Sequence, residues 1–353
     1  YWVIKESGIL NINTNNIIYN YNFFKKLKKN LIVAPTIKAN AYGLGDKKVF
    51  NLLLKNNCKH FFVATLDEGL KLKNKNKLIN IFILNGLQDY NLKRFFNSNL
   101  IPVINSIEEY IRIKNSGLKF AIHVDTGINR LGIPIEKTKE IDFKNKNIQL
   151  IISHLSSADE YNNNYSLKQK KIFTRLKNKF NNNKIIFSLA NSHGAVLNKS
   201  YLYDMIRPGI GIYGGFENKK LGKRIKNVVS LKGKIIQIKY IKKNQYVGYN
   251  RTYKTKTKIK VAIVGLGYED GIPRSLSNKG YVYFKKNRFK IIGRISMDTF
   301  TVDISKSSHD LNIGMYLDII NDEHKIDKFA KLCKTIPNEI MTSIGKRVYR
   351  KYE

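Results

Sequence analysis

The chain has 353 residues and a formal net charge of +38, with 64 lysine and arginine residues against 26 acidic ones. A chain of this length can bury a large core, and its length favours two domains over one. The two cysteines, Cys58 and Cys333, lie far apart and outside any paired-cysteine motif, which argues against a disulfide framework or a cysteine zinc site. No stretch approaches the ~18 consecutive apolar residues of a membrane span, so we expect a soluble, cytoplasmic protein.

The positive charge is also compatible with nucleic-acid binding, since clustered cations bind phosphate backbones. Only 12 of the 64 basic residues are arginines, however, and the lysines are spread along every segment instead of forming one stripe. The sequence contains no RNP, helix-turn-helix or zinc-finger motif. We therefore interpret the charge as a compositional bias of solvated faces and expect no specific nucleic-acid partner.

Short apolar runs alternate with longer amphipathic segments through the first two thirds of the chain. Eight runs are rich in Ile, Val, Phe or Leu and too short for helices, which predicts strands at 31–37, 60–64, 79–84, 100–104, 119–124, 148–152, 184–188 and 205–213. The intervening segments suit crossover helices, as at 46–57, 106–116 and 166–181. Eight such units in roughly 220 residues predict a closed (β/α)8 barrel of the TIM type over residues 1–220.

The pattern changes after Gly215, where short Gly, Asn and Lys turns replace the long amphipathic segments. Further strands are predicted at 228–241, 259–265, 280–284, 288–293, 299–304 and 315–320. A final helix is predicted from about Lys325 to Lys346. The expected fold class is therefore α/β, with the barrel followed by a mainly β domain over residues 221–353.

Lys38 directly follows the first predicted strand and opens a short turn that ends in Gly43. An ammonium at this point is partly desolvated, so it loses its proton readily and can form an imine with an aldehyde cofactor. Reactive groups of such barrels gather at the carboxyl ends of the strands. The predicted strands place Arg130, His154 and Ser192 at the same end, and Arg207 and Gly209 lie around the eighth predicted strand.

Nine blocks of the sequence, in order, resemble the alanine racemases that use pyridoxal 5′-phosphate (PLP). They are KANAYG (38–43), VDTGINRLG (124–132), SHLSSADE (153–160), LANSHG (189–194), MIRPGIGIYG (205–214), YVGYNRTY (246–253), GLGYEDGIPR (265–274), GRISMD (293–298) and TIPNEI (335–340). The resemblance implies a barrel with a second β domain, and a PLP Schiff base on Lys38. It also implies interconversion of L- and D-alanine, which supplies D-alanine for peptidoglycan.

The resemblance assigns further residues to the cofactor. Residues matching the family's phosphate ligands are Tyr42, Ser192, Gly209 and Ile210. Arg207 matches an arginine at the pyridine nitrogen, where most PLP enzymes have a carboxylate. Because a guanidinium cannot accept a proton, the ring nitrogen is expected to stay unprotonated, which favours reprotonation at Cα over transamination.

Racemisation needs a base on each face of the planar adduct, and the resemblance implies Lys38 on one face and Tyr249 on the other. His154 matches the histidine that hydrogen-bonds the tyrosine, and Arg207 would contact that histidine. In the family, Tyr249 and Met297 match residues donated by the partner subunit of a head-to-tail homodimer. The implied active site is therefore composite, and a monomer is expected to be inactive.

Three residues are implied in substrate binding. Arg130 would contact the cofactor's phenolic oxygen and the substrate carboxylate. Met297 would place a backbone N–H near that carboxylate, and Tyr268 matches a tyrosine at the substrate entrance. No metal is expected.

Two positions depart from the family pattern. His123 occupies the place of a carbamylated lysine that orients the arginine matching Arg130, so Arg130 must be held in another way, by His123 or by an anion. Asn338 stands where the family usually has a phosphate-binding tyrosine, which is expected to weaken PLP binding by about 1.5–3 kcal/mol unless Asn338 replaces that contact.

Two alternatives remain within PLP proteins. One is a racemase of broader specificity, or of serine, because the residues of the pocket wall cannot be placed from the sequence. The other is a noncatalytic PLP-binding protein. Such single-domain barrels have the lysine but lack the β domain with Tyr249 and Met297, so the second part of this chain argues against it.

Overall fold

The computed structural model describes residues 6–72, 78–87, 92–96, 98, 100–160, 163–180, 185–216 and 224–353. These residues form two compact units. The first is built mainly from the described residues of Ile17–Ile212, and the second from residues 6–16, 213–216 and Asn227–Glu353. In the part of the chain that the structure describes, no helix has the length and apolar character needed to cross a membrane.

The first unit is a closed barrel of eight parallel strands. They are β2 (Ile32–Val33), β3 (His60–Val63), β4 (Asn80–Ile83), β5 (Leu100–Ile104), β6 (Phe120–Asp125), β8 (Ile148–Ile152), β9 (Ile186–Ser188) and β10 (Met205–Ile206). They follow the order β2-β10-β9-β8-β6-β5-β4-β3, and a parallel bridge between Thr36 and Phe62 joins the two ends of this order. A short strand, β7 (Ile133–Pro134), pairs with β6. The predicted (β/α)8 barrel is confirmed.

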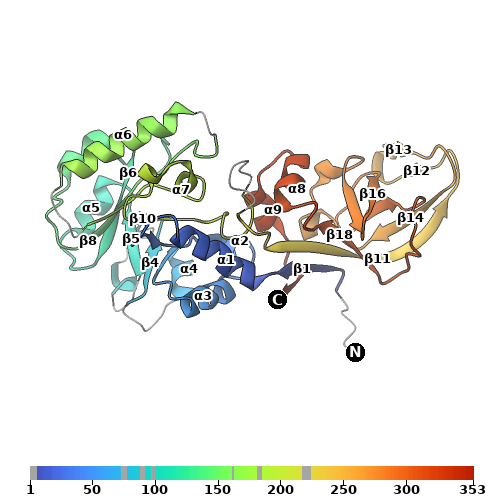
Figure 1. Ribbon diagram of the computed structural model, residues 1–353, viewed down its shortest axis with the longest axis horizontal. Coiled ribbons are helices and arrows are strands. Elements are labelled where there is room, and N and C mark those ends of the chain that lie inside the picture. Colours follow the sequence, from blue (N-terminus) through green and yellow to red (C-terminus); the bar gives the residue numbers. More distant parts are fainter. Residues whose placement is uncertain are drawn as a thin grey trace. The chain divides into compact units, whose positions relative to one another are not determined.

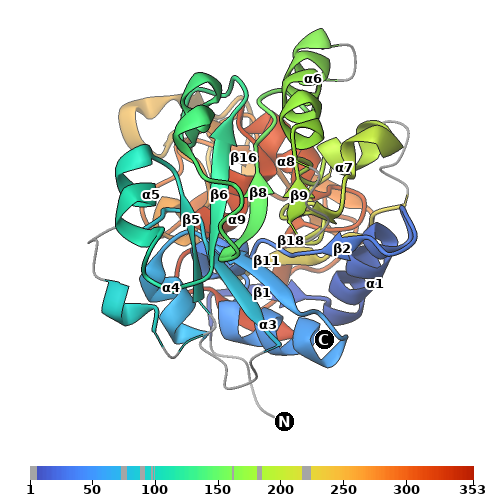
Figure 2. The same cartoon turned by 90° about the vertical axis from the view of Figure 1, so that its left-hand side faces the viewer.

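Helices surround the barrel strands (Figure 2). They are α1 (Thr14–Lys25), α2 (Lys38–Tyr42), α3 (Asp46–Lys55), α4 (Leu66–Lys71), α5 (Ile107–Ile113), α6 (Asn164–Asn178) and α7 (Gly194–Leu197), with 3-10 turns η1 (Leu92–Arg94), η2 (Ile135–Glu140) and η3 (Lys199–Tyr201). Side chains cap several of these helices. Thr65 accepts from the N–H of Glu68 at the start of α4, and Ser106 accepts from that of Glu109 at the start of α5. The predicted crossover helices correspond to α3, α5 and α6.

The barrel interior is apolar. Its buried cluster comprises Ala34, Phe62, Phe82, Ile101, Val103, Ala121, Leu150, Ile152 and Met205. The rings of Phe62 and Phe82 stack with their centroids 4.7 Å apart. These side chains come from alternate positions of their strands, as expected for a barrel whose inner face is filled by side chains.

The second unit is built on an eight-stranded sheet in the order β14-β17-β16-β15-β18-β11-β1-β19 (Figure 1). Its strands are β1 (Gly8–Ile12), β11 (Val229–Ile241), β14 (Ile259–Val264), β15 (Tyr281–Phe284), β16 (Asn287–Ile292), β17 (Phe300–Asp303), β18 (Tyr316–Ile320) and β19 (Tyr349–Tyr352). The long strand β11 pairs with β1 and β18 in its first half and with β14 in its second, with a register shift between Ile235 and Gln237. Such an irregularity bends the strand, so one segment serves both parts of the sheet.

Shorter elements complete this unit. They are the hairpin of β12 (Tyr246–Val247) and β13 (Tyr253–Lys254), the 3-10 turns η4 (Tyr249–Arg251), η5 (Tyr268–Asp270) and η6 (Arg274–Leu276), and the helices α8 (Ile326–Leu332) and α9 (Pro337–Ser343). The six strands predicted after residue 227 correspond to β11 and to β14 through β18.

Three features differ from the sequence-based expectation. The predicted single helix from Lys325 to Lys346 is wrong, because Lys334 adopts a left-handed conformation with φ 60° and Pro337 begins a new helix. Five strands were not predicted, namely β1 and β19, which pair with each other, β7, which pairs with β6, and the hairpin strands β12 and β13. Residues up to Asn16, counted with the barrel in the predicted range 1–220, belong to the second unit because β1 also pairs with β11.

Candidate active site

A layer of polar side chains lies at the carboxyl ends of the barrel strands, above the apolar interior. Alternate residues of a strand share a face, so the residues two places after the interior positions also point into the barrel mouth. The interior positions are Ala34, Val103, Ala121, Ile152 and Met205. The corresponding mouth residues are Thr36, Asn105, His123, His154 and Arg207.

Lys38 follows Thr36 by two residues and begins a turn of unusual handedness. The next four residues have positive φ angles of 51°, 55°, 51° and 55°, at Ala39, Asn40, Ala41 and Tyr42. A left-handed turn of this kind costs roughly 1–2 kcal/mol per residue for side chains other than glycine. Hydrogen bonds hold it, from the N–H of Gly43 to Ala39 O and from that of Gly45 to Asn40 O, both 2.9 Å.

The environment of Lys38 favours the neutral amine. Burial lowers the pKa of Lys38, the nearby charge of Arg130 lowers it further, and Glu68 opposes both. Arg130 itself is exposed and lies in the loop between β6 and β7. A lysine with a lowered pKa is a better nucleophile and a better base than one in water.

The residues predicted to hold a phosphate lie together on the side of β10. The Ser192 hydroxyl is buried and accepts hydrogen bonds from the N–H groups of Gly209 and Gly211, both 3.0 Å, while its own proton remains to be donated. The hydroxyl of Tyr42 packs against the Cα of Gly209 so closely that an added Cβ would collide with it. Burial raises the pKa of Tyr42 to about 12, so this phenol stays protonated and can donate. Ile210, the remaining predicted ligand, is buried next to them in sequence.

Arg207 is 5% exposed and is held by the backbone of two strands. Its Nη1 donates to the carbonyl and the hydroxyl of Ser188 at 2.8 and 2.5 Å, and its Nη2 donates to Ser153 O at 2.5 Å. The guanidinium also lies over the ring of Phe62, 5.8 Å from the centroid. Burial lowers the pKa of Arg207 to about 9, which leaves it charged at neutral pH.

His154 is neutral in this setting. Burial holds its pKa well below the usual histidine range, and the charges of Arg207 and Arg130 lower it further. A neutral imidazole has one nitrogen that accepts a hydrogen bond, which a protonated one lacks. The mouth therefore combines two guanidinium cations, Arg130 and Arg207, and the amine of Lys38 with an uncharged acceptor.

His123 is also buried and neutral, and its tautomer is defined. The amide of Asn105 donates to two carbonyls, Leu84 O at 2.9 Å and Val103 O at 2.8 Å, so its oxygen must face His123. That oxygen lies 2.9 Å from His123 Nδ1, which must carry the proton. Nε2 is then a buried acceptor, and it has no hydrogen-bond partner among the described residues. Burial, with Arg207 and Arg130, lowers the pKa of His123 to about 3.

The remaining candidate residues belong to the second unit, and the three predicted to act at the site are exposed. Tyr249 is 65% exposed, Met297 51% and Tyr268 45%. Asn338 lies in α9, half-buried, and its carbonyl accepts from the hydroxyl of Thr342 at 2.9 Å. The contacts described for these residues are all contacts within the second unit.

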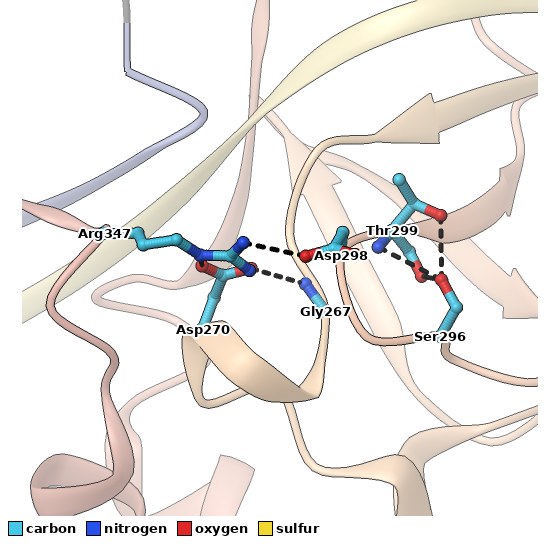
Figure 3. Close-up of polar contacts among 6 residues, drawn as sticks. All are labelled: Gly267, Asp270, Ser296, Asp298, Thr299 and Arg347. Carbon is cyan, nitrogen blue, oxygen red and sulfur yellow. Dashed lines mark hydrogen bonds and ion pairs between the residues drawn. The ribbon is translucent and has the colours of Figure 1, made fainter.

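Arg347 ties together the loops that carry Tyr268 and Met297 (Figure 3). Its guanidinium binds both oxygens of buried Asp270, at 3.0 and 3.1 Å, and one oxygen of Asp298 at 2.8 Å. Asp270 also accepts from the N–H of Gly267 at 2.9 Å. The N–H of Tyr268 donates to Ser296 O at 3.1 Å, which joins the loops directly.

A second group of hydrogen bonds closes the loop that carries Met297. The hydroxyl of Ser296 lies 2.9 Å from that of Thr299, donates to Thr299 O at 2.7 Å and accepts from Thr299 N–H at 3.2 Å (Figure 3). Met297 thus occupies a fixed turn while its side chain remains exposed.

Sequence reasoning missed several polar residues of the barrel mouth. Asn105 and Ser188 orient His123 and Arg207, yet neither stands in a motif. Glu68 was also missed, although Thr65-Leu66-Asp67-Glu68 has the spacing of a capping box and so contained a readable signal.

Two domain families match the chain. "Alanine racemase, N-terminal domain" matches residues 12–217, and "Alanine racemase, C-terminal domain" matches residues 228–352. The chain belongs to the alanine racemase family. An alanine racemase of Rickettsia africae (strain ESF-5) is 35% identical over 354 residues, covering 97% of this chain and 98% of that relative.

Solved structures of alanine racemases have the same fold. The alanine racemase from Bartonella henselae with covalently bound pyridoxal phosphate has a TM-score of 0.90 at 30% identity, covering 98% of this chain and 99% of that one. The biosynthetic alanine racemase from Pseudomonas aeruginosa has a TM-score of 0.86 at 25% identity, with 99% of each chain covered. The resemblance seen in the sequence, the fold class and the assignment to a family of PLP-dependent racemases are therefore confirmed.

Proposed function

We propose that this protein is an alanine racemase that interconverts L- and D-alanine with PLP as cofactor. The observation that carries the proposal is the position of Lys38, which has a lowered pKa and lies in a strained turn at the mouth of the barrel. The mouth also holds the guanidinium groups of Arg130 and Arg207, which suit an anionic cofactor and a substrate carboxylate.

The residues present fit PLP. The hydroxyls of Tyr42 and Ser192 lie at the backbone of Gly209, where they can donate to a phosphate. Arg207 is fixed by strand carbonyls and cannot accept a proton, so it suits an unprotonated ring nitrogen. When bound, PLP supplies the electron sink that makes the α-proton of the amino acid acidic.

Proton movement is assigned to two residues of this chain. Lys38 Nζ removes or returns the α-proton on one face, because its lowered pKa favours the neutral amine that can accept this proton. The Tyr249 hydroxyl acts on the other face, and the neutral imidazole of His154 accepts a hydrogen bond from it. Arg130 and the backbone of Met297 bind the substrate carboxylate, and Tyr268 lines the substrate entrance.

We further propose a head-to-tail homodimer in which Tyr249 and Met297 serve the site of the partner subunit. The exposure of both side chains supports this, since a tyrosine and a methionine at such positions gain stability when another surface covers them. The free, buried cysteines Cys58 and Cys333 suit the reducing cytoplasm, where D-alanine would be made for peptidoglycan.

The test follows α-proton exchange in deuterium oxide, using purified protein with added PLP and each alanine enantiomer in turn. Both enantiomers should exchange and interconvert. Borohydride reduction followed by digestion should place the pyridoxyl group on the peptide that contains Lys38. If no pyridoxyl adduct were found on this peptide at saturating PLP, the proposal would be overturned.

The same assay separates the alternatives. A broader-specificity or serine racemase would exchange L-serine at a rate comparable to L-alanine. A noncatalytic PLP-binding protein would give the adduct on Lys38 without exchange of either enantiomer. The matched control is Lys47→Ala, which removes an exposed lysine of α3 and should change neither result.

A further inference from the structure

Glu68 links the turn that carries Lys38 to the end of strand β3. Its Oε1 accepts a hydrogen bond from the N–H of Ala39 at 2.7 Å. Its Oε2 accepts from the N–H groups of Ala64 and Thr65, at 2.7 and 3.3 Å. One carboxylate therefore holds two backbone segments that lie 25 or more residues apart in the sequence.

The bond to Ala39 falls at a decisive point of the turn. The N–H of Ala39 belongs to the peptide group that joins it to Lys38, so fixing this group limits the rotation that aims the lysine side chain. Ala39 is also the first of the four left-handed residues. Such residues persist only where the surrounding structure holds them.

The second effect of Glu68 is electrostatic. The residues named around Lys38 in the barrel mouth are cationic or neutral, and Glu68 is the acidic group that raises the pKa of Lys38 against burial and Arg130. A nearby carboxylate stabilises positive charge on a lysine nitrogen. Geometry and charge thus converge on the same residue.

We propose that Glu68 is a positioning residue for Lys38: its carboxylate anchors the left-handed turn to the end of β3 and holds the lysine nitrogen at the barrel mouth. The proposal rests on the proposed function only in taking Lys38 as the reactive lysine. A purely structural role, as the capping box of α4, is the competing explanation. In that box Thr65 Oγ1 accepts from the N–H of Glu68 at 3.2 Å, and this bond does not involve Ala39.

The two roles are separated by three variants of the holoenzyme. Glu68→Gln keeps the size of the side chain but has a single acceptor oxygen, so it cannot serve both Ala39 and the end of β3. Glu68→Asp keeps the charge but shortens the reach. Thr65→Ala breaks the other half of the capping box and leaves the carboxylate in place.

The first readout is amide hydrogen exchange of the peptide covering residues 38–45, measured by mass spectrometry. Glu68→Gln should speed this exchange by about tenfold or more, the factor that corresponds to one lost hydrogen bond to a charged group. Glu68→Asp should do the same, whereas Thr65→Ala should leave it unchanged. Equal protection in wild type and Glu68→Gln would overturn the anchoring role.

The second readout is the pH at which the visible absorption of the bound cofactor changes. Without the negative charge this pH should fall in Glu68→Gln and return toward the wild-type value in Glu68→Asp. A profile that is identical in all variants would overturn the electrostatic role. If wild-type protein carried no pyridoxyl group on Lys38, the proposed function would fail, while the exchange comparison would still decide whether Glu68 anchors the turn.

Discussion

The two units present their candidate site residues in opposite ways. In the barrel, Arg207 and His123 are almost fully buried, and burial is the largest influence on the pKa of each. In the second unit, Tyr249 and Met297 are mostly exposed. The barrel therefore sets the environment of its candidate site residues by its own fold. Tyr249 and Met297, in contrast, leave solvent only when another surface covers them. The composite site proposed above, shared between subunits, would account for this difference.

The largest expected effect comes from the exposed side of this comparison. Tyr249→Phe removes the hydroxyl proposed as the second base and leaves the fold unchanged, because the side chain is exposed. Loss of one acid–base group typically costs about 10²- to 10⁴-fold in rate. Racemisation should fall by this factor, and α-deuterium exchange of L-alanine should fall more than that of D-alanine.

Tyr246→Phe is the matched control, since it removes another exposed hydroxyl three residues earlier in the same unit. It should leave both exchange rates within about twofold of wild type. Equal loss of exchange with the two enantiomers in Tyr249→Phe would contradict the assignment of lysine and tyrosine to opposite faces.

The barrel was predictable from the sequence because its strands are continuous apolar runs, which parallel strands buried on both faces require. Strands β1 and β19 were not, because they are only five and four residues long and acquire their partners from distant segments, as in the pairing of Leu10 with Arg350. The break between α8 and α9 was marked by Pro337, a residue that starts helices more readily than it continues them. That signal was present and was overlooked.

The candidate site shows the same division. Lys38 and His154 were found because each stands in a motif at the end of a predicted strand, and Arg207 because it stands in a motif around the eighth predicted strand. The residues that orient them were not, because their contacts join segments far apart in sequence, such as Ala39 with Glu68, 29 residues apart. Sequence motifs identify the reactive groups, whereas the hydrogen bonds that orient them can be identified only in the folded chain.

The next effect probes the buried side of the comparison through pH. His123 has a pKa of about 3 in the fold, against about 6.5 in the unfolded chain. Below pH 6.5 the unfolded chain binds a proton that the folded one does not, so stability is full above this pH and is lost as the pH falls toward 3. The loss should be about 1.4 kcal/mol per pH unit, or roughly 2 kcal/mol by pH 5.

Urea unfolding at pH 7 and pH 5 measures this loss, and His123→Gln supplies the comparison. Glutamine does not titrate, and His154 is present in both proteins. The difference between the two proteins in the stability lost from pH 7 to pH 5 therefore reports on His123 alone. The variant should lose less stability than wild type between these pH values. Equal losses in the two proteins would mean that His123 binds a proton in the fold as readily as in the unfolded chain, in conflict with its burial and with the nearby charges of Arg207 and Arg130.

The smallest expected effect concerns the ion pairs of Arg347, whose guanidinium binds the buried carboxylate of Asp270 and the exposed carboxylate of Asp298. Asp270→Asn removes the buried charge, whose two oxygens bind Arg347 and the N–H of Gly267. The free energy of unfolding should fall by about 1–2 kcal/mol, because an amide has one acceptor oxygen for the contacts that two oxygens made. Asp298→Asn makes the same change on the exposed arm, where the side chain is 58% exposed, and should cost less than about 0.5 kcal/mol since solvent screens such a pair. Urea unfolding of both variants measures these two losses of stability. Equal losses would show that burial does not set the strength of the contacts of Arg347. The loops that carry Tyr268 and Met297 would then owe their conformation to the direct bond from Tyr268 N–H to Ser296 O.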